Sequence, residues 1–385
     1  MSDVSKISLL GMDKAQIAAL IPDMPMFTSS QIYGFLMDGK DFDEMTSLKK
    51  EYREYLKEHY VANPVSILEV FQGKLGTKKY LFRLDDQLIE GVYMPHDYGN
   101  TLCLSTQIGC RMGCTFCAST LDGLVRNLTP AEMLGQVIAV NRDNGGTAKT
   151  RGVTNLVLMG SGEPFDNYDN VLEFLDEVSK EGGINISERN ISLSTSGLCD
   201  KIRKFADSGH KVTLSISLHA PFDDLRSALM PVNKAYGVKQ LVDCAKYYFE
   251  KTGRRVIFEY TLIKGENDSD ACARELARLT KGFPSHVNLI RLNEVKERDH
   301  EAPSVDATED FLKKLEKLGV SATIRKSLGN DIEGACGQLR RRYLKENGEI
   351  SEKRIDKSTN AIRFSHKNKQ IEHIANKGQN GTENS

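Results

Sequence analysis

The feature that most constrains the fold is a regular alternation of strand-like and helix-like segments that begins at Thr101. Six runs rich in β-branched residues are separated by helical patterns, and they lie at 101–107, 154–159, 190–195, 212–217, 254–262 and 286–292. This alternation predicts parallel strands joined by right-handed helical crossovers. Because a closed barrel needs about eight such strands, we expect an α/β fold built as an open, partial (β/α)6 barrel.

The segments around this alternation predict a domain order. Residues 1–75 contain patterns such as MTSLKKEYREYLKEHY and predict a small N-terminal helical domain. Residues 76–100 contain YLFRLDDQLIEGVYMP, which predicts a hairpin or linker that turns at DDQ. The barrel and a glycine-rich C-terminal loop then occupy 101–343, and 344–385 form a polar tail that we expect to be disordered.

Composition bounds the class of protein. Hydrophobic residues make up 39% and charged residues 27% of the chain, which is ordinary for a globular protein. The start, MSDVSKISLL, does not resemble a signal peptide, and no apolar run reaches membrane-spanning length. We therefore expect a cytoplasmic protein without a membrane partner, in which clustered cysteines bind metal or react rather than form structural disulfides.

The charge is uneven along the chain. Residues 340–385 hold eleven Lys and Arg residues against six Asp and Glu residues, although the whole chain carries a formal net charge of −1. A basic tail on an acidic body points weakly to nucleic acid. A solvated, disordered tail explains the same composition equally well.

The stretch CRMGCTFC places Cys110, Cys114 and Cys117 directly after the first barrel strand, where barrel enzymes keep their chemistry. A closed zinc site needs four ligands and usually two CxxC-like pairs, and no second pair exists here. Three cysteines instead suit a 4Fe–4S cluster with one iron open to substrate. The spacing, with Phe116 before the last cysteine, resembles the signature of radical S-adenosylmethionine (SAM) enzymes. Zinc ligation or buried structural cysteines are the alternatives.

Other polar groups follow the ends of the predicted strands. MGSGEP ends the second strand and brings Gly162 and Glu163, whose carboxylate could accept hydrogen bonds from the SAM ammonium. The third, fourth and sixth strands end at STSG, SLHAP and Asn293, and the candidate cofactor-binding residues there are Ser194, Ser217, Leu218, His219 and Asn293. Taken alone, His219 is more often a hydrogen-bonded structural histidine. Cys244 and Cys272 lie beside apolar helix faces and are expected in the core.

Several longer motifs in the same order resemble the RlmN/Cfr family of RNA adenine methyltransferases, and the RlmN branch most closely. They are TLCLSTQIGCRMGCTFC, GLVRNLTPAEMLGQV, MGSGEP, SLSTSG, SISLHAP, LMPVNK, VNLIRLN and IRKSLGNDIEGACGQL, from about Gly91 to Arg340. The sequence departs from the family pattern at Ser161 and at Leu292–Asn293–Glu294. Both departures could alter cofactor contacts.

The resemblance implies roles that composition does not. Cys336 would be methylated by one SAM, and a radical derived from a second SAM would remove a hydrogen atom from that methyl group. The carbon would then join adenine, linking protein and RNA. Cys103 would resolve the adduct and form a transient disulfide with Cys336, and Glu90 would accept the proton. Without the resemblance, Cys103 would be a core residue and Glu90 an exposed hairpin residue.

The resemblance also implies the substrate and the partners. The target would be an adenosine in the peptidyl-transferase region of 23S rRNA, and also the adenosine beside the anticodon of tRNA. RlmN-type methylation at C2 is favoured over Cfr-type methylation at C8, which is associated with antibiotic resistance. An electron donor such as flavodoxin or ferredoxin and a monomeric state are expected. A non-catalytic zinc RNA-binding protein and a radical SAM enzyme for a small molecule or peptide are the other hypotheses.

Overall fold

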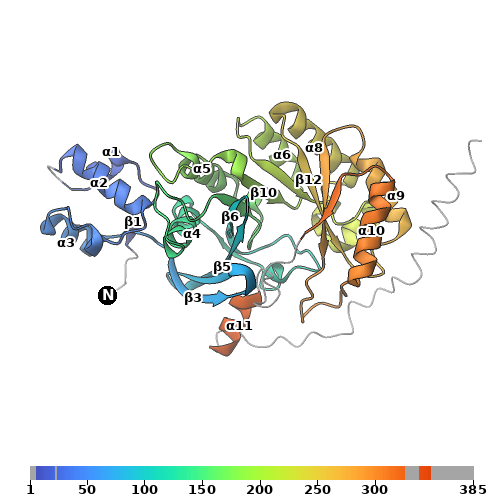
Figure 1. Ribbon diagram of the computed structural model, residues 1–385, viewed down its shortest axis with the longest axis horizontal. Coiled ribbons are helices and arrows are strands. Elements are labelled where there is room, and N and C mark those ends of the chain that lie inside the picture. The colour runs from blue at the N-terminus through green and yellow to red at the C-terminus, as the bar shows by residue number, and fades with distance from the viewer. Residues whose placement is uncertain (1–5, 22–23, 326–337, 348–385) are drawn as a thin grey trace, which may run out of the picture.

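One 10-stranded sheet forms the centre of the protein, in the order β14-β13-β12-β11-β10-β9-β6-β5-β4-β3 (Figure 1). This computed structural model describes residues 6–21, 24–325 and 338–347. The strands of the sheet are β3 (Ser66–Gln72), β4 (Lys78–Leu84), β5 (Gln87–His96), β6 (Gly99–Cys103), β9 (Asn155–Leu158), β10 (Ile191–Thr195), β11 (Thr213–Ser217), β12 (Val256–Leu262), β13 (Ser285–Arg291) and β14 (Ala322–Ile324).

The parallel half of the sheet contains the six predicted strands. β6 pairs in parallel with β9, and parallel pairing continues through β10, β11, β12 and β13. β14, which was not predicted, adds a seventh parallel strand beside β13. Within the described residues, β3 and β14 pair on one side only, so the sheet is open, as predicted.

The other half of the sheet is antiparallel. The predicted hairpin forms as β4 and β5 around Asp85, whose positive φ of 49° suits a tight turn. It is more than a linker, because β5 pairs with β6 and β3 extends the sheet beyond β4. β3 also corrects the expectation that residues 1–75 are helical throughout. The domain boundaries themselves stay a prediction.

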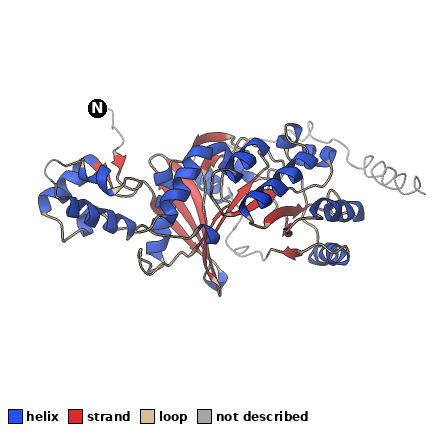
Figure 2. Ribbon diagram, turned by 90° about the horizontal axis from the view of Figure 1, so that it is seen from above, coloured by secondary structure: helices blue, strands red, loops and turns tan. Residues whose placement is uncertain are grey.

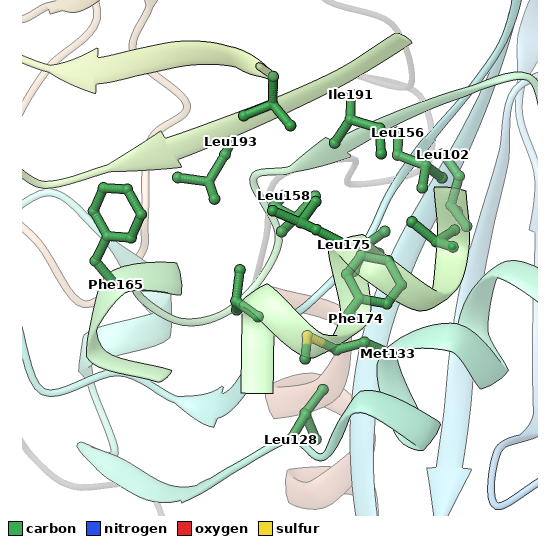
Figure 3. Close-up of a cluster of buried hydrophobic side chains, with 14 of the residues drawn as sticks. Leu102, Leu128, Met133, Leu156, Leu158, Phe165, Phe174, Leu175, Ile191 and Leu193 are labelled. Atoms are coloured by element: carbon green, nitrogen blue, oxygen red, sulfur yellow. The ribbon is translucent and has the colours of Figure 1, made fainter. Parts of the chain in front are cut away.

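Helices pack along the outer side of the parallel strands (Figure 2). Their apolar side chains form part of the hydrophobic core. These helices are α4 (Pro130–Asp143), α5 (Tyr168–Ser179), α6 (Cys199–Ala206), α7 (Asp223–Leu229), α8 (Val238–Thr252), α9 (Asp270–Thr280) and α10 (Val305–Lys317). Leu156 and Leu193 from the sheet meet Met133 of α4 and Phe174 of α5, and all four side chains are fully buried (Figure 3). Cys244 and Cys272 are buried in this core, as predicted.

The remaining helices lie at the two ends of the chain. α1 (Lys14–Ala18), α2 (Met26–Met37) and α3 (Lys50–His59) form a group beside the sheet, tied by the short parallel pair β1 (Ile7–Ser8) and β2 (Tyr60–Val61) (Figure 1). α11 (Gln338–Glu346) packs against β5. The predicted tail boundary at residue 344 falls inside this helix. None of the described helices is long and apolar enough to cross a membrane.

Local sequence explains where α4 begins. Thr129 caps the helix by accepting a 3.2 Å hydrogen bond from the Glu132 N–H, and the Glu132 carboxylate accepts one of 2.8 Å from the Thr129 N–H. Pro130 occupies the first turn, where its missing N–H costs nothing. This reciprocal box matches the start predicted from TPAE.

Candidate active site

The three clustered cysteines lie on a loop that a short sheet holds in place. β7 (Gln107–Gly109) pairs with β8 (Leu124–Asn127), and Cys110 follows β7 directly. Gly109 has a φ of +75°, and a Cβ there would lie 2.0 Å from the Gly123 carbonyl oxygen, so only glycine fits. The Thr120 hydroxyl donates hydrogen bonds to the carbonyls of Cys114 and Cys117, at 3.1 and 3.0 Å.

The loop faces a cavity of about 270 Å³. Eight of the residues predicted from the sequence line it together, and they are Cys110, Cys114, Cys117, Gly162, Glu163, Ser194, Ser217 and His219. They come from the loops that follow β7, β9 and β11 and from the C-terminal ends of β10 and β11. Because the strands are parallel, their C-terminal ends lie together. Side chains that are more than a hundred residues apart in the sequence therefore line one cavity.

The chemistry of the cysteines fits a metal cluster. Cys110 and Cys114 are buried, and burial raises the pKa of Cys110 to about 12. Burial and the neighbouring Cys117 also raise the pKa of Cys114. Thiolates in such a place need positive charge beside them. Three cysteines on one loop match the ligand count of a 4Fe–4S cluster with one open iron. In the described part of the chain, no three His, Cys, Asp or Glu side chains are grouped so as to hold a single metal ion.

Glu163 is the buried acid of this cavity. Its carboxylate accepts hydrogen bonds from the N–H groups of Phe165 at 3.1 Å and of Ser196 at 2.6 Å, and burial raises its pKa. Gly162 precedes it with a φ of +111°, and a Cβ there would lie 2.6 Å from the Gln107 Cβ. The buried Ser196 hydroxyl lies beside the Glu163 carboxylate, and it forms no hydrogen bond of good geometry with another described residue. Such an orphan lining a cavity fits a polar ligand such as SAM.

His219 is a neutral structural element of the wall. Its Nδ1 accepts a 2.9 Å hydrogen bond from the Thr261 N–H, and burial lowers its pKa to about 3. Phe116 lies edge-on to its ring, with centroids 4.9 Å apart. The imidazole therefore stays uncharged at neutral pH and can contact a ligand but cannot act as a general acid there.

Arg226, which the sequence did not single out, organises the loops around the cavity. Its fully buried guanidinium donates hydrogen bonds to the carbonyls of Ser196 at 2.6 Å, Ser217 at 2.9 Å and Leu218 at 3.0 Å. A further bond of 3.0 Å reaches the Asn233 side chain. Leu218 is completely buried, so its link to the site is this carbonyl rather than an exposed side chain.

Glu259 is a second acid that sequence analysis missed. It lines the cavity from β12, accepts a 2.9 Å hydrogen bond from Asn288, and has a pKa raised by burial. Arg325, which follows β14, lines the same cavity. An acidic residue inside the apolar strand VIFEYTL was the available signal.

Glu90 and Cys103 lie on one face of the antiparallel strands, beside the cavity. Cys103 is opposite Val92, and Glu90 is two residues from Val92, so both side chains project from the same face. Glu90 is buried, contrary to what the hairpin alone suggested, and forms an ion pair with Lys79. Ser119 lines both the Glu90 pocket and the cavity of the cysteines, which places the two next to each other.

Some predicted residues are not brought together. Asn293 lies two residues beyond the end of β13 with an exposed side chain, and it does not line the cavity. Ser161, expected near the cofactor, lines the pocket of Glu90 instead. Cys336 lies outside the described residues. None of the seven described cysteines forms a disulfide with another one, so the predicted Cys103–Cys336 bond stays a prediction.

A largely buried arginine anchors α11 to the segment that follows the three cysteines. Arg341 donates a 2.7 Å hydrogen bond to Asp122 and one of 3.2 Å to Glu297, and its side chain is 10% exposed. The central residue of the basic run Arg340–Arg342 therefore holds the helix in place.

Known proteins show the same arrangement of sequence and fold. A family model described as the Radical SAM superfamily matches residues 104–276. A "Probable dual-specificity RNA methyltransferase RlmN" from Alkaliphilus oremlandii (strain OhILAs) is 48% identical over 346 residues, covering 89% of this chain and 99% of that protein. The protein of the same name from Clostridioides difficile (strain 630) is 47% identical, over 83% of this chain and 93% of its own length.

A solved structure extends the comparison to three dimensions. The crystal structure of a radical SAM methyltransferase from Sphaerobacter thermophilus matches with a TM-score of 0.81 and 41% identity, over 86% of this chain and 98% of that chain. The sequence and structural similarity together cover the cysteine loop, the cavity and the antiparallel extension. The chain belongs to the RlmN family of radical SAM RNA methyltransferases.

Proposed function

We propose that this enzyme methylates C2 of an adenosine in the peptidyl-transferase region of 23S rRNA and of the adenosine beside the anticodon of tRNA. The observation that carries the proposal is the adjacency of two sites through Ser119, the cysteine cavity and the Glu90–Cys103 face. A simple methyl transfer from SAM needs only the first. A reaction that also resolves a protein–RNA adduct needs a base and a second thiol close by.

The cavity provides the parts for binding cofactor. Cys110, Cys114 and Cys117 would hold the cluster and leave one iron open to SAM. When bound, the cluster and SAM would supply a 5′-deoxyadenosyl radical in one step and a methyl group in another. Glu163 would accept a hydrogen bond from the amino group of SAM, and Ser194, Ser217 and His219 would contact the rest of the molecule. The exposed Asn293 would reach SAM only if its loop moved inward.

The chain's own residues would carry the carbon and the proton. In this proposal, the Cys336 thiol loses its proton and takes the methyl group. One methyl C–H bond would then break, with the hydrogen atom leaving on the 5′-deoxyadenosyl fragment, and the remaining CH2 would bond to C2 of the adenine. Glu90 accepts the C2 proton, and the extra electron of the radical adduct would return to the cluster. The Cys103 thiolate attacks the Cys336 sulfur and forms a disulfide, while the sulfur–carbon electron pair stays on the CH2 carbon, which takes a proton to become the new methyl group. The electron donor would reduce the disulfide with two electrons. C2 of adenine is electron-poor, so this indirect route avoids using it as a nucleophile.

The remaining parts of the proposal concern partners. The target base would be unstacked and presented to the mouth of the barrel, as enzymes that act on bases require. The N-terminal helices and the basic tail would contribute phosphate and shape contacts. We further propose a cytoplasmic monomer that receives electrons from a flavodoxin or ferredoxin.

A reaction with purified protein tests the proposal. Anaerobic enzyme with SAM, a reductant and unmodified 23S rRNA or tRNA should yield 2-methyladenosine, detected by nucleoside mass spectrometry. Cys336→Ala should give no product, and Cys103→Ala should accumulate a covalent protein–RNA adduct. 8-Methyladenosine would instead indicate the C8 reaction, and full turnover by Cys336→Ala would rule out the methyl-carrier mechanism.

A further inference from the structure

Lys79 is a completely buried lysine on the face that carries Glu90 and Cys103. Its Nζ lies 3.0 Å from Glu90 Oε2, and the two side chains are 0% and 6% exposed. Lys79 and Cys103 are the partners of Val92 on its two sides, so all three side chains project from one face of the sheet. Lysine is rarely buried to this extent unless it is paired.

Described residues surround the pair on several sides. Glu90 Oε1 accepts a hydrogen bond from the Arg340 backbone N–H at the start of α11. Among the described residues that line this pocket, the other charged ones are Asp122 and Arg340, and Asp122 is itself bound to Arg341. Leu81 and Leu88 of the hairpin and Leu339 and Leu344 of α11 form an apolar cluster in the same part of the protein.

Stability alone does not explain why this pair is buried. Removing two charges from water costs about as much as their attraction returns, and apolar residues of similar size are often at least as stable. The neighbouring Lys78 projects from the opposite face, and its pair with Asp143, at 2.8 Å, stays partly exposed at 19% and 32%. The same strand therefore has a solvated ion pair on one face and a buried one beside Cys103.

We propose that Lys79 is a positioning residue for Glu90, and this rests on the proposed function. In the proton transfer, the adenine C2–H bond breaks and an O–H bond forms on the Glu90 carboxylate. Lys79 holds one carboxylate oxygen in place through a charge-assisted contact of 3.0 Å. The α11 backbone fixes the other oxygen. Together they aim the base before the RNA adduct forms.

The test compares three variants in the cluster-loaded full chain. Lys79→Met removes the charge, Lys79→Arg retains it, and Lys78→Met is the matched control on the other face of β4. We measure 2-methyladenosine and the covalent protein–RNA adduct on denaturing gels. Lys79→Met should lower product about 10- to 100-fold, within the range that a general base contributes. The adduct should accumulate, because the proton is removed more slowly from a base that is no longer held in position.

The controls separate positioning from folding. Lys79→Arg should restore at least part of the product, and Lys78→Met should behave like wild type. Because Lys79→Met leaves a buried carboxylate without its cation, Glu90→Gln and the double variant are measured as well. If Lys79 acts through Glu90, Lys79→Met should add nothing to the defect of Glu90→Gln.

The outcomes also distinguish the two proposals. Normal product and no accumulated adduct in Lys79→Met would overturn the role of Lys79 alone. So would additive defects in the double variant. A wild-type enzyme that forms no methyladenosine on any RNA would overturn the proposed function, and the role of Lys79 with it.

Discussion

Ser196 joins Glu163 to Arg226 through its backbone N–H and carbonyl groups, which lie in the cavity wall. Its N–H donates a 2.6 Å hydrogen bond to the Glu163 carboxylate, and its carbonyl accepts one of 2.6 Å from the Arg226 guanidinium. The acid and the arginine are both buried. The loop after β10 is therefore held between a buried anion and a buried cation, and a change at either residue should move the other.

Glu163→Gln should weaken SAM binding about tenfold or more, because it replaces a charge-assisted hydrogen bond with a neutral one. Burial raises the Glu163 pKa above its ordinary 4.5, so its ionised fraction grows as pH rises past that value. Wild-type SAM affinity should rise with pH over this range, and the variant should be flat. Anaerobic calorimetry measures both, and equal affinities at every pH would contradict the assignment.

The ionisation of Glu163 should also change the free energy of unfolding, in the direction opposite to its effect on SAM affinity. A group whose pKa is raised on folding stabilises the folded state below its unfolded pKa, and this contribution is lost as pH rises through the folded pKa. In the absence of SAM, wild type should therefore lose stability relative to Glu163→Gln as pH rises above about 4.5. Urea unfolding at several pH values measures the difference. A constant difference would mean that Glu163 does not titrate in this window.

Arg226→Met should destabilise the fold by about 3 kcal/mol or more, because it leaves several buried carbonyls without donors, at about 1–3 kcal/mol each. Arg226→Lys should keep the positive charge but lose the branched guanidinium that hydrogen-bonds to the carbonyls of Ser196, Ser217 and Leu218. The affinity for SAM should therefore fall, while the cluster is retained. The control is Arg203→Met on the exposed side of α6, which should change stability by about 0.5 kcal/mol or less. Unchanged SAM affinity in Arg226→Lys would contradict the positioning role.

Alanine variants of Cys110, Cys114 and Cys117 should each lose the cluster, whereas Cys272→Ala should keep it. The reconstituted wild type should hold about four irons per chain and be brown. One zinc per chain and no colour would favour the zinc hypothesis instead. After the iron is chelated, Cys110 should be alkylated slowly at pH 8, because burial raises its pKa to about 12.

Arg341→Met should loosen α11, because it removes the contacts with Asp122 and Glu297. We expect a loss of about 2 kcal/mol in the free energy of unfolding and faster proteolysis of α11. Reductive cleavage of SAM without RNA should continue, since the cysteine loop keeps its other contacts. The half-exposed Arg342 is the control for stability, and an equal effect of Arg342→Met would contradict the anchoring role of Arg341.

Local patterns predicted the parallel half of the fold well. Six β-branched runs form six of the seven parallel strands, and the TPAE motif forms the start of α4, because each depends on neighbouring residues. The radical SAM fold and family membership are confirmed by the relatives and by the solved neighbour. The glycine-rich turns after the strands indicated where the site lies, because the C-terminal ends of parallel strands all lie at the same end of the barrel.

Contacts between distant segments were not predictable in this way. Arg226 looks like an ordinary charged residue of a short helix until β10 and β11 bring three carbonyls to it. Lys79 and Glu90 become partners only through the hairpin register. Asn293 was expected at the mouth because it follows a strand, but the chain turns outward after β13 and leaves it exposed.

The measurement that tests the central claim most directly is nucleoside mass spectrometry of rRNA and tRNA from cells that lack this gene, with and without the gene restored. The account predicts that restoration brings 2-methyladenosine back to 23S rRNA and to tRNA. 8-Methyladenosine would place the reaction at the other carbon and predict antibiotic resistance. No change in any methyladenosine would contradict the claim that this protein methylates adenine in RNA.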